Sequence, residues 1–173
     1  MNAATLINQT SGKTEYYTPA PIIEAARRTM GGIDLDPASC EQANQIVKAG
    51  HIFTVAKSGL AQPWFGRVWM NHPFGRSAND AWITKLNISY LTKQVEQACC
   101  ITFACTSEAW FLPLFAYPMC FLSPRTNYLD AHGRTVRGVT KGSVVTYMGP
   151  NVRRFTDAFG ELGAVMVPER VAV

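Results

Sequence analysis

The sequence predicts an α/β protein: a mostly parallel β-sheet with helices on both faces and an antiparallel strand at one edge. The first observation behind this prediction is that short apolar runs alternate with segments of helical periodicity along the chain. The second is the run from Cys99 to Cys105, which is almost entirely apolar and is typical of a strand buried on both faces. The third is the composition, 47% hydrophobic and 16% charged over 173 residues, which suits a globular chain with a covered sheet.

The first half of the chain is expected to begin with a helix. Its apolar residues recur at helical spacing, at positions 22, 23, 26 and 30, and Gly31-Gly32 ends it. Thr18 is expected to cap this helix, and the neighbouring prolines suit its first turn. The elements predicted next are a strand at 33–37, a helix at 41–49, a strand at 51–55, a loop at 58–65 and a strand at 67–70.

The second half continues the alternation. A helix is predicted at 78–98, with one apolar face that includes Trp82, and the apolar strand at 99–105 follows it. Trp64 and Trp82 are expected to pack in the core. The remaining predicted elements are a helix at 107–117, strands at 119–122 and 143–148, a helix at 152–159 and a last strand at 164–167.

Residues 1–15 are predicted to form a polar, weakly structured arm, and residues 16–173 a single domain without a separate recognition domain. The net charge of +4 permits a polyanionic partner. The five cysteines form no CxxC pair and no metal-ligand spacing, so we expect buried thiols in a reducing cytosol and no metal. Neither a secretory leader nor an apolar run of the roughly 20 residues needed to span a membrane is recognised.

The stretch from 66 to 75 joins an apolar strand to Asn71-His72-Pro73-Phe74 and a glycine. A polar amide, a proline-stiffened turn and an aromatic ring at the end of a buried strand occupy the position where α/β folds place their ligand chemistry. Asn, Pro and Gly are also ordinary turn formers, so a strand-ending turn without a chemical role is the alternative interpretation.

These residues suit the activation of an exocyclic amino group on a nucleobase. The lone pair of that nitrogen is delocalised into the ring, and two hydrogen-bond acceptors can draw the nitrogen toward tetrahedral geometry. Asn71 supplies a side-chain oxygen. The backbone carbonyl of His72 is the second candidate, because Pro73 biases the preceding residue toward an extended conformation. Phe74 offers a face on which a flipped base can stack, and Pro73 adds rigidity.

Asn71-His72-Pro73-Phe74 resembles the Asn/Asp-Pro-Pro-Tyr/Phe motif of amino-directed DNA methyltransferases. Tyr17-Thr18-Pro19 before a helix resembles the amino-terminal cofactor-contacting motif of those enzymes, and Leu35-Asp36-Pro37-Ala38 resembles their first S-adenosylmethionine motif. The order of these blocks over residues 15–167, with 59–64 before the motif strand and Trp110-Phe111 after the next, is similar to the small phage-type DNA N6-adenine methyltransferases of the Dam type.

This resemblance implies a Rossmann-like methyltransferase fold, S-adenosylmethionine as the methyl donor and the N6 amino group of adenine in double-stranded DNA as the acceptor. It also implies a phage or prophage protein acting in the cytoplasm of a bacterial host. The catalytic residues that it implies are Asn71, His72, Pro73 and Phe74. The cofactor-binding residues assigned on this basis are Tyr17, Thr18, Pro19, Asp34, Asp36, Pro37, Ala38 and Asn71.

Two features depart from the family pattern. His72 replaces the first proline of the motif, which retains the backbone carbonyl but adds a titratable ring that could tune or obstruct the site. No acidic residue follows the second strand to hold the cofactor ribose, so Asp34 or Asp36 is expected to take over part of that work. Two alternatives to adenine methylation stay open: methylation of cytosine N4, and a DNA-binding protein that has lost turnover through His72.

Basic side chains are the expected source of contacts to DNA phosphates. The segment between Ser123 and Ser143 is rich in basic residues and glycine, and residues 77–80, just past the motif, are a further candidate surface. A solvated loop without a DNA-binding role is the alternative for this segment. The residues predicted to contact DNA are Arg76, Arg125, Arg134, Arg137 and Lys141.

Overall fold

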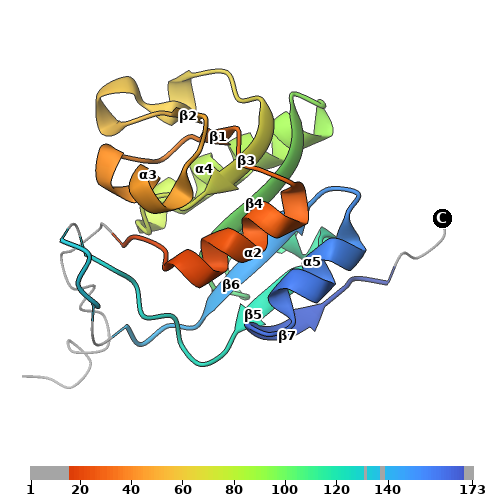
Figure 1. Ribbon diagram of the computed structural model, residues 1–173. Coiled ribbons are helices and arrows are strands. Elements are labelled where there is room, and N and C mark those ends of the chain that lie inside the picture. Colours follow the sequence, from red (N-terminus) through yellow and green to blue (C-terminus); the bar gives the residue numbers. More distant parts are fainter. Residues whose placement is uncertain (1–15, 131, 137–138, 170–173) are drawn as a thin grey trace, which may run out of the picture.

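The computed structural model describes residues 16–130, 132–136 and 139–169. In these residues seven strands form a single mixed sheet in the order β2-β1-β3-β4-β6-β5-β7 (Figure 1). The parallel half consists of β2 (His51–Ile52), β1 (Leu35–Asp36), β3 (Gly66–Met70) and β4 (Val95–Phe103). The antiparallel half consists of β6 (Ser143–Met148), β5 (Met119–Leu122) and β7 (Gly163–Met166).

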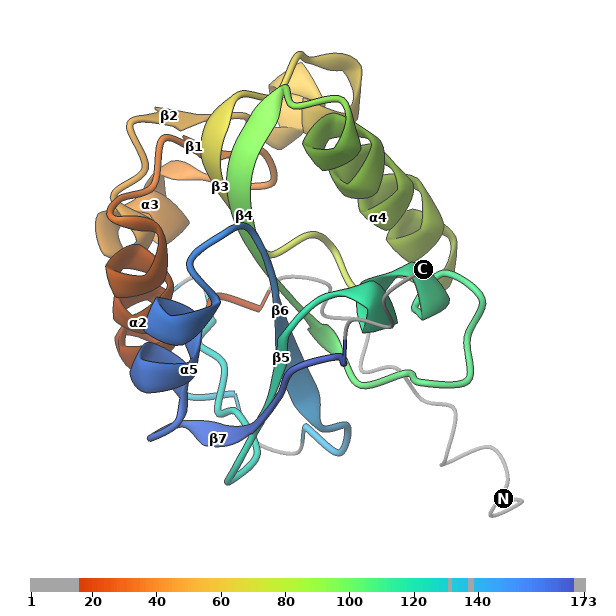
Figure 2. The same ribbon diagram turned by 90° about the vertical axis from the view of Figure 1, so that its right-hand side faces the viewer.

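Helices cover both faces of this sheet, as Figure 2 shows with the sheet seen edge-on. On one face lie α2 (Ala20–Met30), α3 (Glu41–Val47) and α5 (Val152–Phe159). On the other lie α4 (Arg76–Leu91) and the 3-10 helix η3 (Leu112–Ala116). Two further 3-10 turns, η1 (Val55–Lys57) and η2 (Gly59–Ala61), connect β2 to β3. None of the helices among the described residues is long and apolar enough to span a membrane.

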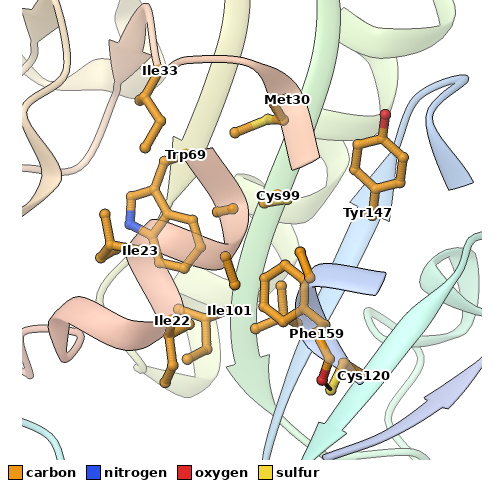
Figure 3. Close-up of a cluster of buried hydrophobic side chains, with 14 of the residues drawn as sticks. Ile22, Ile23, Met30, Ile33, Trp69, Cys99, Ile101, Cys120, Tyr147 and Phe159 are labelled. Carbon is orange, nitrogen blue, oxygen red and sulfur yellow. Dashed lines mark hydrogen bonds between the residues drawn. The ribbon is translucent and has the colours of Figure 1, made fainter. Parts of the chain in front are cut away.

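The two layers of core follow from the alternation of side chains along the central strands. In β3, Trp69 points toward α2, whereas Val68 and Met70 belong to the cluster under α4. In β4, Cys99 and Ile101 alternate in the same way with Ala98 and Cys100. Figure 3 shows the α2 side of this core, where Trp69 and Cys99 lie among side chains from α2, α5 and the neighbouring strands.

The predicted α/β class, with helices on both faces, is confirmed. The antiparallel part is larger than the single edge strand that the sequence predicted, because β6 lies inside the sheet, antiparallel to both β4 and β5. Since β5 and β4 both oppose β6, they share a direction, so the first five strands of the chain run the same way and β6 and β7 run against them. The predicted mostly parallel sheet is therefore correct in the sense that five of the seven described strands point in the same direction.

Three predicted helix features are wrong in detail. The helix predicted at 78–98 ends at Leu91, because Lys93 adopts the left-handed region (φ 61°) and β4 begins at Val95; no glycine or proline marks this change in the sequence. The helix predicted at 107–117 is only the 3-10 turn η3, which contains a proline near its start. Thr18 does not cap α2, because the residue at the N-cap is Pro19.

Candidate active site

A cavity of about 310 Å³ lies at the carboxyl ends of β1, β2 and β3. Because these strands are parallel, the residues that follow them meet at one edge of the sheet. The wall brings together residues 16–18, 36–40 and 71–74, which include parts of all three sequence blocks. The other lining residues are Ala43, Val47, Phe53, Thr54, Val55, Ser58, Gly59, Leu60, Trp69 and Trp82. Small-molecule sites are typically about 300–1,000 Å³, so the cavity is large enough for one.

Asn71 is the first residue after β3, and its amide is fixed by the segment that precedes α2. The Nδ2 atom of Asn71 lies 2.6 Å from the carbonyl oxygen of Tyr16. A carbonyl oxygen accepts hydrogen bonds and cannot donate them, so the amide presents its NH₂ group to Tyr16. No described residue donates a hydrogen bond to the Oδ1 atom of Asn71. This oxygen is thus an available acceptor on a residue that lines the cavity.

His72 places its imidazole in the wall between the motif and α4, with only 1% of the residue exposed. Its Nε2 atom lies 2.7 Å from Oδ1 of Asn79. The imidazole meets the Phe74 ring edge-on at 5.8 Å and lies 6.3 Å from the Trp82 ring. Burial lowers the pKa of His72 to about 4, so the ring is neutral at pH 7. The second ring nitrogen, Nδ1, is buried and has no hydrogen-bond partner among the described residues.

Phe74 belongs to a group of four aromatic rings that also contains Tyr16, Phe103 and Tyr128. Its ring centre lies 4.4 Å from that of Phe103, 6.1 Å from Tyr16 and 5.8 Å from Tyr128. Phe103 is the last residue of β4, and the Tyr128 hydroxyl shares a 2.8 Å hydrogen bond with Ser143 at the start of β6. Offset and edge-on contacts of this kind stabilise aromatic groups, so the cluster holds Phe74 at the side of the cavity.

Asp36 is the last residue of β1 and lines the cavity although it is only 2% exposed. Its Oδ1 atom accepts a 3.2 Å hydrogen bond from the backbone N–H of Ala38. Burial raises the pKa of Asp36 from its usual 3.8 to about 7. A cationic group of a ligand would offset the cost of charging this carboxyl, because an opposite charge favours the ionised form.

Thr18 supplies a second polar group to the same wall. The residue is 5% exposed, and its hydroxyl oxygen is buried without a hydrogen-bond partner among the described residues. A buried hydroxyl without a partner is costly, and a bound ligand with a polar atom at this point would remove the cost. The cavity therefore offers a buried carboxyl that accepts the Ala38 N–H and a hydroxyl that has no partner among the described residues.

The β2–β3 connection closes tightly on the Asp36 block. A Cβ atom at Gly59 would collide with the carbonyl oxygen of Pro37, so glycine is required there. The indole N–H of Trp64 donates to the Gly59 carbonyl at 2.8 Å. From α4, the Lys85 ammonium donates to the carbonyls of Leu60 and Gln62 at 2.9 and 2.7 Å. These bonds fix this side of the wall.

Two residues predicted to bind the cofactor, Asp34 and Pro19, lie outside the cavity wall. The carboxylate of Asp34 forms an ion pair with Arg67, with an O–N distance of 2.7 Å, and also accepts the backbone N–H of Arg67 at 2.8 Å. Hydrogen bonding to Arg67 lowers the pKa of Asp34. Gly66, with φ 61°, brings the chain against the Asp34 carboxylate, which lies near the amino end of β3. Asp34 is thus engaged in joining β1 to β3.

The segment that leads into α2 is paired with the connection between β5 and β6. Tyr17 and Leu129 exchange backbone hydrogen bonds of 2.8 and 2.9 Å. Figure 1 shows this connection running beside the first described residues. The pairing places the predicted basic segment next to the cavity, since Tyr17 also lines its wall.

The predicted DNA-binding residues differ in their surroundings. Arg125 is exposed, and Arg134 forms a 2.9 Å ion pair with Asp130. Hydrogen bonds from Arg134, first from its backbone N–H and then from its side chain, lower the pKa of Asp130 to about 2. The ammonium of Lys141 lies 5.7 Å from the Phe103 ring centre, beside the aromatic group that holds Phe74. Arg76 is the first residue of α4, and Arg137 lies outside the described residues.

Four residues at the site were not singled out from the sequence as site residues: Tyr16, Asn79, Phe103 and Tyr128. Tyr16 contributes a backbone carbonyl, for which a sequence holds no signal. Phe103 lay inside the predicted strand at 99–105 and Tyr128 inside the basic segment between Ser123 and Ser143. Neither position indicated a contact with Phe74, because that contact is long-range. Asn79 lay inside a segment predicted to face the substrate, but its bond to His72 depends on where α4 begins.

The fold and this site are those of an α/β protein with a small-molecule cavity at the carboxyl ends of its parallel strands. The family model described as DNA N-6-adenine-methyltransferase (Dam) matches residues 8–162, and the chain therefore belongs to the Dam family. The resemblance inferred from the sequence blocks is confirmed by this match. A search of curated proteins finds none that matches the chain.

Proposed function

We propose that the protein transfers a methyl group from S-adenosylmethionine to the N6 amino group of adenine in double-stranded DNA. Membership of the Dam family supports methylation of adenine N6. The observation that carries the proposal for this chain is the orientation of the Asn71 amide. Its NH₂ group is engaged by the Tyr16 carbonyl, which leaves the side-chain oxygen to accept a hydrogen bond beside the cavity.

In the proposed reaction, Asn71 Oδ1 and the backbone carbonyl of His72 accept the two N–H groups of the flipped adenine. These bonds draw the lone pair of N6 toward the methyl group. The C–S bond breaks as the C–N bond forms, and one of the N6 protons then passes to water. Phe74, held by the rings around it, stacks on the adenine and fixes its plane.

The residues of the cavity fit S-adenosylmethionine, which supplies a methyl group on a positively charged sulfur. The buried Asp36 carboxyl can accept hydrogen bonds from the α-amino group. The Thr18 hydroxyl, which lacks a partner among the described residues, can donate to the α-carboxylate. Apolar side chains such as Phe53 and Leu60 suit the remainder of the cofactor. Tyr17, Pro37 and Ala38 lie in the same wall and retain their proposed cofactor contacts.

The proposed DNA surface is the β5–β6 connection beside the cavity. Lys141 and Arg125 are exposed there, and phosphate contacts from such residues would hold the duplex while adenine is flipped. Arg134 can contribute once it exchanges Asp130 for a phosphate. Arg76 and Arg137 remain in the proposal as sequence-based expectations.

Methylation of cytosine N4 uses the same pair of acceptors and is the second candidate within the enzyme class. A DNA-binding protein without turnover is the candidate from another class. The His72 ring is buried against Trp82 and bonded to Asn79, so it is packed into the wall between the motif and α4. This packing favours turnover over the interpretation in which the ring obstructs the site.

The decisive experiment incubates the protein with S-adenosylmethionine carrying a labelled methyl group and with unmethylated double-stranded DNA. The DNA is then hydrolysed to nucleosides and separated. Label in N6-methyl-2′-deoxyadenosine supports the proposal, and label in N4-methyl-2′-deoxycytidine supports the alternative of cytosine methylation. Absence of label at saturating enzyme, with cofactor binding intact, leaves the DNA-binding interpretation.

A matched pair of variants makes the result specific to the site. Asn71→Ala removes the proposed acceptor, whereas Asn87→Ala removes an asparagine on α4 whose side chain accepts a 2.9 Å hydrogen bond from Tyr117, a residue outside the cavity wall. Only the first variant is expected to lose methyl transfer. An equal loss of methyl transfer in both variants would show that the loss comes from a general effect on stability and not from the site.

A further inference from the structure

The turn from Asn71 to Gly75 lacks the restraint that a proline at position 72 would provide. Proline fixes its own φ near −65° and so limits the direction of the carbonyl that follows. Histidine has no such restriction. Pro73 biases the ψ angle of His72 toward extended values but leaves its φ angle free. The proposed reaction requires the His72 carbonyl to point at one place, so a further contact is needed to restrain this residue.

The backbone beyond the motif forms a short hydrogen-bonded unit with α4. Gly75 N–H donates to the Pro73 carbonyl at 2.9 Å, and the N–H groups of Ala78 and Asn79 donate to the Gly75 carbonyl at 3.0 and 3.1 Å. Asn79 therefore lies in the first turns of α4 at a fixed position relative to Pro73. These bonds restrain Pro73 and Gly75 but make no contact with His72 itself.

The side chain of His72 has one polar anchor among the described residues. A neutral imidazole carries one N–H, and because Nε2 faces the Asn79 side-chain oxygen at 2.7 Å, the proton belongs on Nε2. The other nitrogen, Nδ1, is buried and has no hydrogen-bond partner in the part of the chain that the structure describes. Within residues 16–130, 132–136 and 139–169, the bond to Asn79 is thus the one hydrogen bond of a ring whose residue is 1% exposed.

Packing alone leaves the ring less well determined. Phe74 meets it edge-on, and Trp82 lies beside it at 30° between the ring planes, and neither contact distinguishes the two faces of the imidazole. A hydrogen bond is directional and selects one orientation. The bond from His72 to Asn79 is therefore the feature that can substitute for proline rigidity.

We propose that Asn79 is a positioning residue for methyl transfer, which acts by holding the His72 ring and thereby the direction of the His72 carbonyl. This inference rests on the proposed function, because it concerns the carbonyl that accepts one N–H of adenine. Asn79 contacts neither substrate nor cofactor in this account. Its loss should lower kcat and leave the KM for S-adenosylmethionine unchanged, since Asp36 and Thr18 lie on other segments.

The first test compares Asn79→Ala with Asn87→Ala, two asparagines on the same helix that each form one side-chain hydrogen bond. We expect Asn79→Ala to lower kcat by about 10- to 100-fold, in the range expected when a reacting group is misplaced by about 1 Å. Asn87→Ala should change kcat less than about twofold, because its bond lies far from the reacting atoms. Equal losses, or a loss confined to the cofactor KM, would overturn the proposal.

The second test uses two substitutions at His72, each of which places an amide group near the position of one of the two ring nitrogens. The amide nitrogen of glutamine is three bonds from Cβ, as Nε2 is, so His72→Gln keeps a donor for Asn79. His72→Asn places its amide atoms nearer the backbone, in the position of Nδ1, and loses that donor. Higher kcat in His72→Gln supports the proposal. Equal or reversed activity contradicts it, provided that both variants are folded by circular dichroism.

The third test detects the hydrogen bond between His72 and Asn79 in the absence of substrate and cofactor. NMR of ¹⁵N-labelled histidine should report a proton on Nε2 of His72 in the wild type. In Asn79→Asp the new carboxylate faces this ring and should raise its pKa by at least about one unit, as an opposite charge at hydrogen-bond distance does. An unchanged pKa would show that the side chains do not interact. This measurement tests the hydrogen bond between His72 and Asn79 independently of methyl transfer. If the wild-type protein shows the bond but transfers no methyl group, the proposed function is wrong although the contact exists.

Discussion

The parallel and antiparallel halves of the sheet contribute different things to the site. The described residues that line the cavity all lie between Tyr16 and Trp82, in or near the parallel half. The antiparallel half, with the connection between β5 and β6, provides Tyr128 behind Phe74 and the exposed Lys141.

This division has a physical basis. Parallel strands carry all their following loops to one edge, where a concave site can form. Antiparallel strands return the chain to that edge between β5 and β6, which allows a long connection to reach the rim of the cavity without lining it. Under the proposed function, the cofactor and the reacting atoms therefore belong to the parallel half. The phosphate contacts of Arg125 and Lys141 belong to the connection between β5 and β6, so the two can be perturbed separately.

The largest expected effect is that of Asn71→Ala, at the centre of the parallel half. Loss of a preorganised hydrogen-bonding group at a reacting atom typically costs about 10²–10³-fold in kcat, and we expect a loss of at least this size. Affinity for S-adenosylmethionine, measured by calorimetry, should stay within a few-fold. A large loss of cofactor affinity would instead assign Asn71 mainly to cofactor binding.

The next effect separates two acids of the same strand region. Asp36→Asn should weaken S-adenosylmethionine binding by roughly 10-fold or more, because it removes the carboxyl proposed to meet the cofactor amino group. Asp34→Asn should leave that affinity within about twofold, since Asp34 is paired with Arg67 outside the cavity. Calorimetric titration of both variants checks this contrast. Equal weakening would mean that Asp34 acts on the cofactor after all.

The dependence of stability on pH gives a test of intermediate size, because Asp36 and His72 oppose each other. The pKa of Asp36 is raised from 3.8 to about 7 by burial, so the folded state holds this proton more tightly and stability falls as pH rises from 4 toward 7. The pKa of His72 is lowered from 6.5 to about 4, so stability falls as pH drops from 6.5 toward 4.

Each slope is about 1.4 kcal/mol per pH unit at most, and the two nearly cancel in the wild type between these limits. In Asp36→Asn only the His72 effect remains, so the free energy of unfolding should fall as pH drops from 6.5 toward 4. In His72→Gln only the Asp36 effect remains, so the free energy of unfolding should fall as pH rises from 4 toward 7. Urea unfolding at several pH values measures both slopes. Slopes of the same sign in the two variants would contradict these assignments.

The smallest expected effect lies in the antiparallel half. Lys141→Ala should weaken DNA binding by about two- to tenfold and reduce the salt dependence by about one phosphate contact. Affinity for S-adenosylmethionine should not change, because Lys141 does not line the cavity. Fluorescence anisotropy at a series of salt concentrations checks both statements. A loss of affinity for S-adenosylmethionine in Lys141→Ala would contradict the proposal that the connection between β5 and β6 contacts DNA and not the cofactor.

The sequence predicted the features that depend on local pattern. The motif strand, the turn that follows it and the Asp36 block were recognisable because each combines an apolar run with turn-forming residues. Their meeting at one cavity followed from parallel strand order, which the alternation of strands and helices indicates.

The features that sequence reasoning missed depend on contacts between distant residues. Asp34 and Asp36 look equivalent in the sequence, and only the approach of Arg67 gives the first a structural partner. The antiparallel insertion of β6 has no local signal, because side-chain alternation is the same for both strand directions. The contact between His72 and Asn79 likewise joins the motif to α4, which begins at Arg76 and not at the predicted residue 78.

The pairing of Tyr17 with Leu129 has a consequence for the order in which the molecule becomes functional. The two residues lie about 110 positions apart, so closing this contact is entropically costly and is expected late in folding. A nascent chain that ends before Leu129 contains Asp36 and Asn71 but lacks the partner that pairs with the segment holding the Asn71 amide. Under the proposed function, the segment that holds the Asn71 amide therefore gains its backbone partner only after the ribosome has synthesised the connection between β5 and β6.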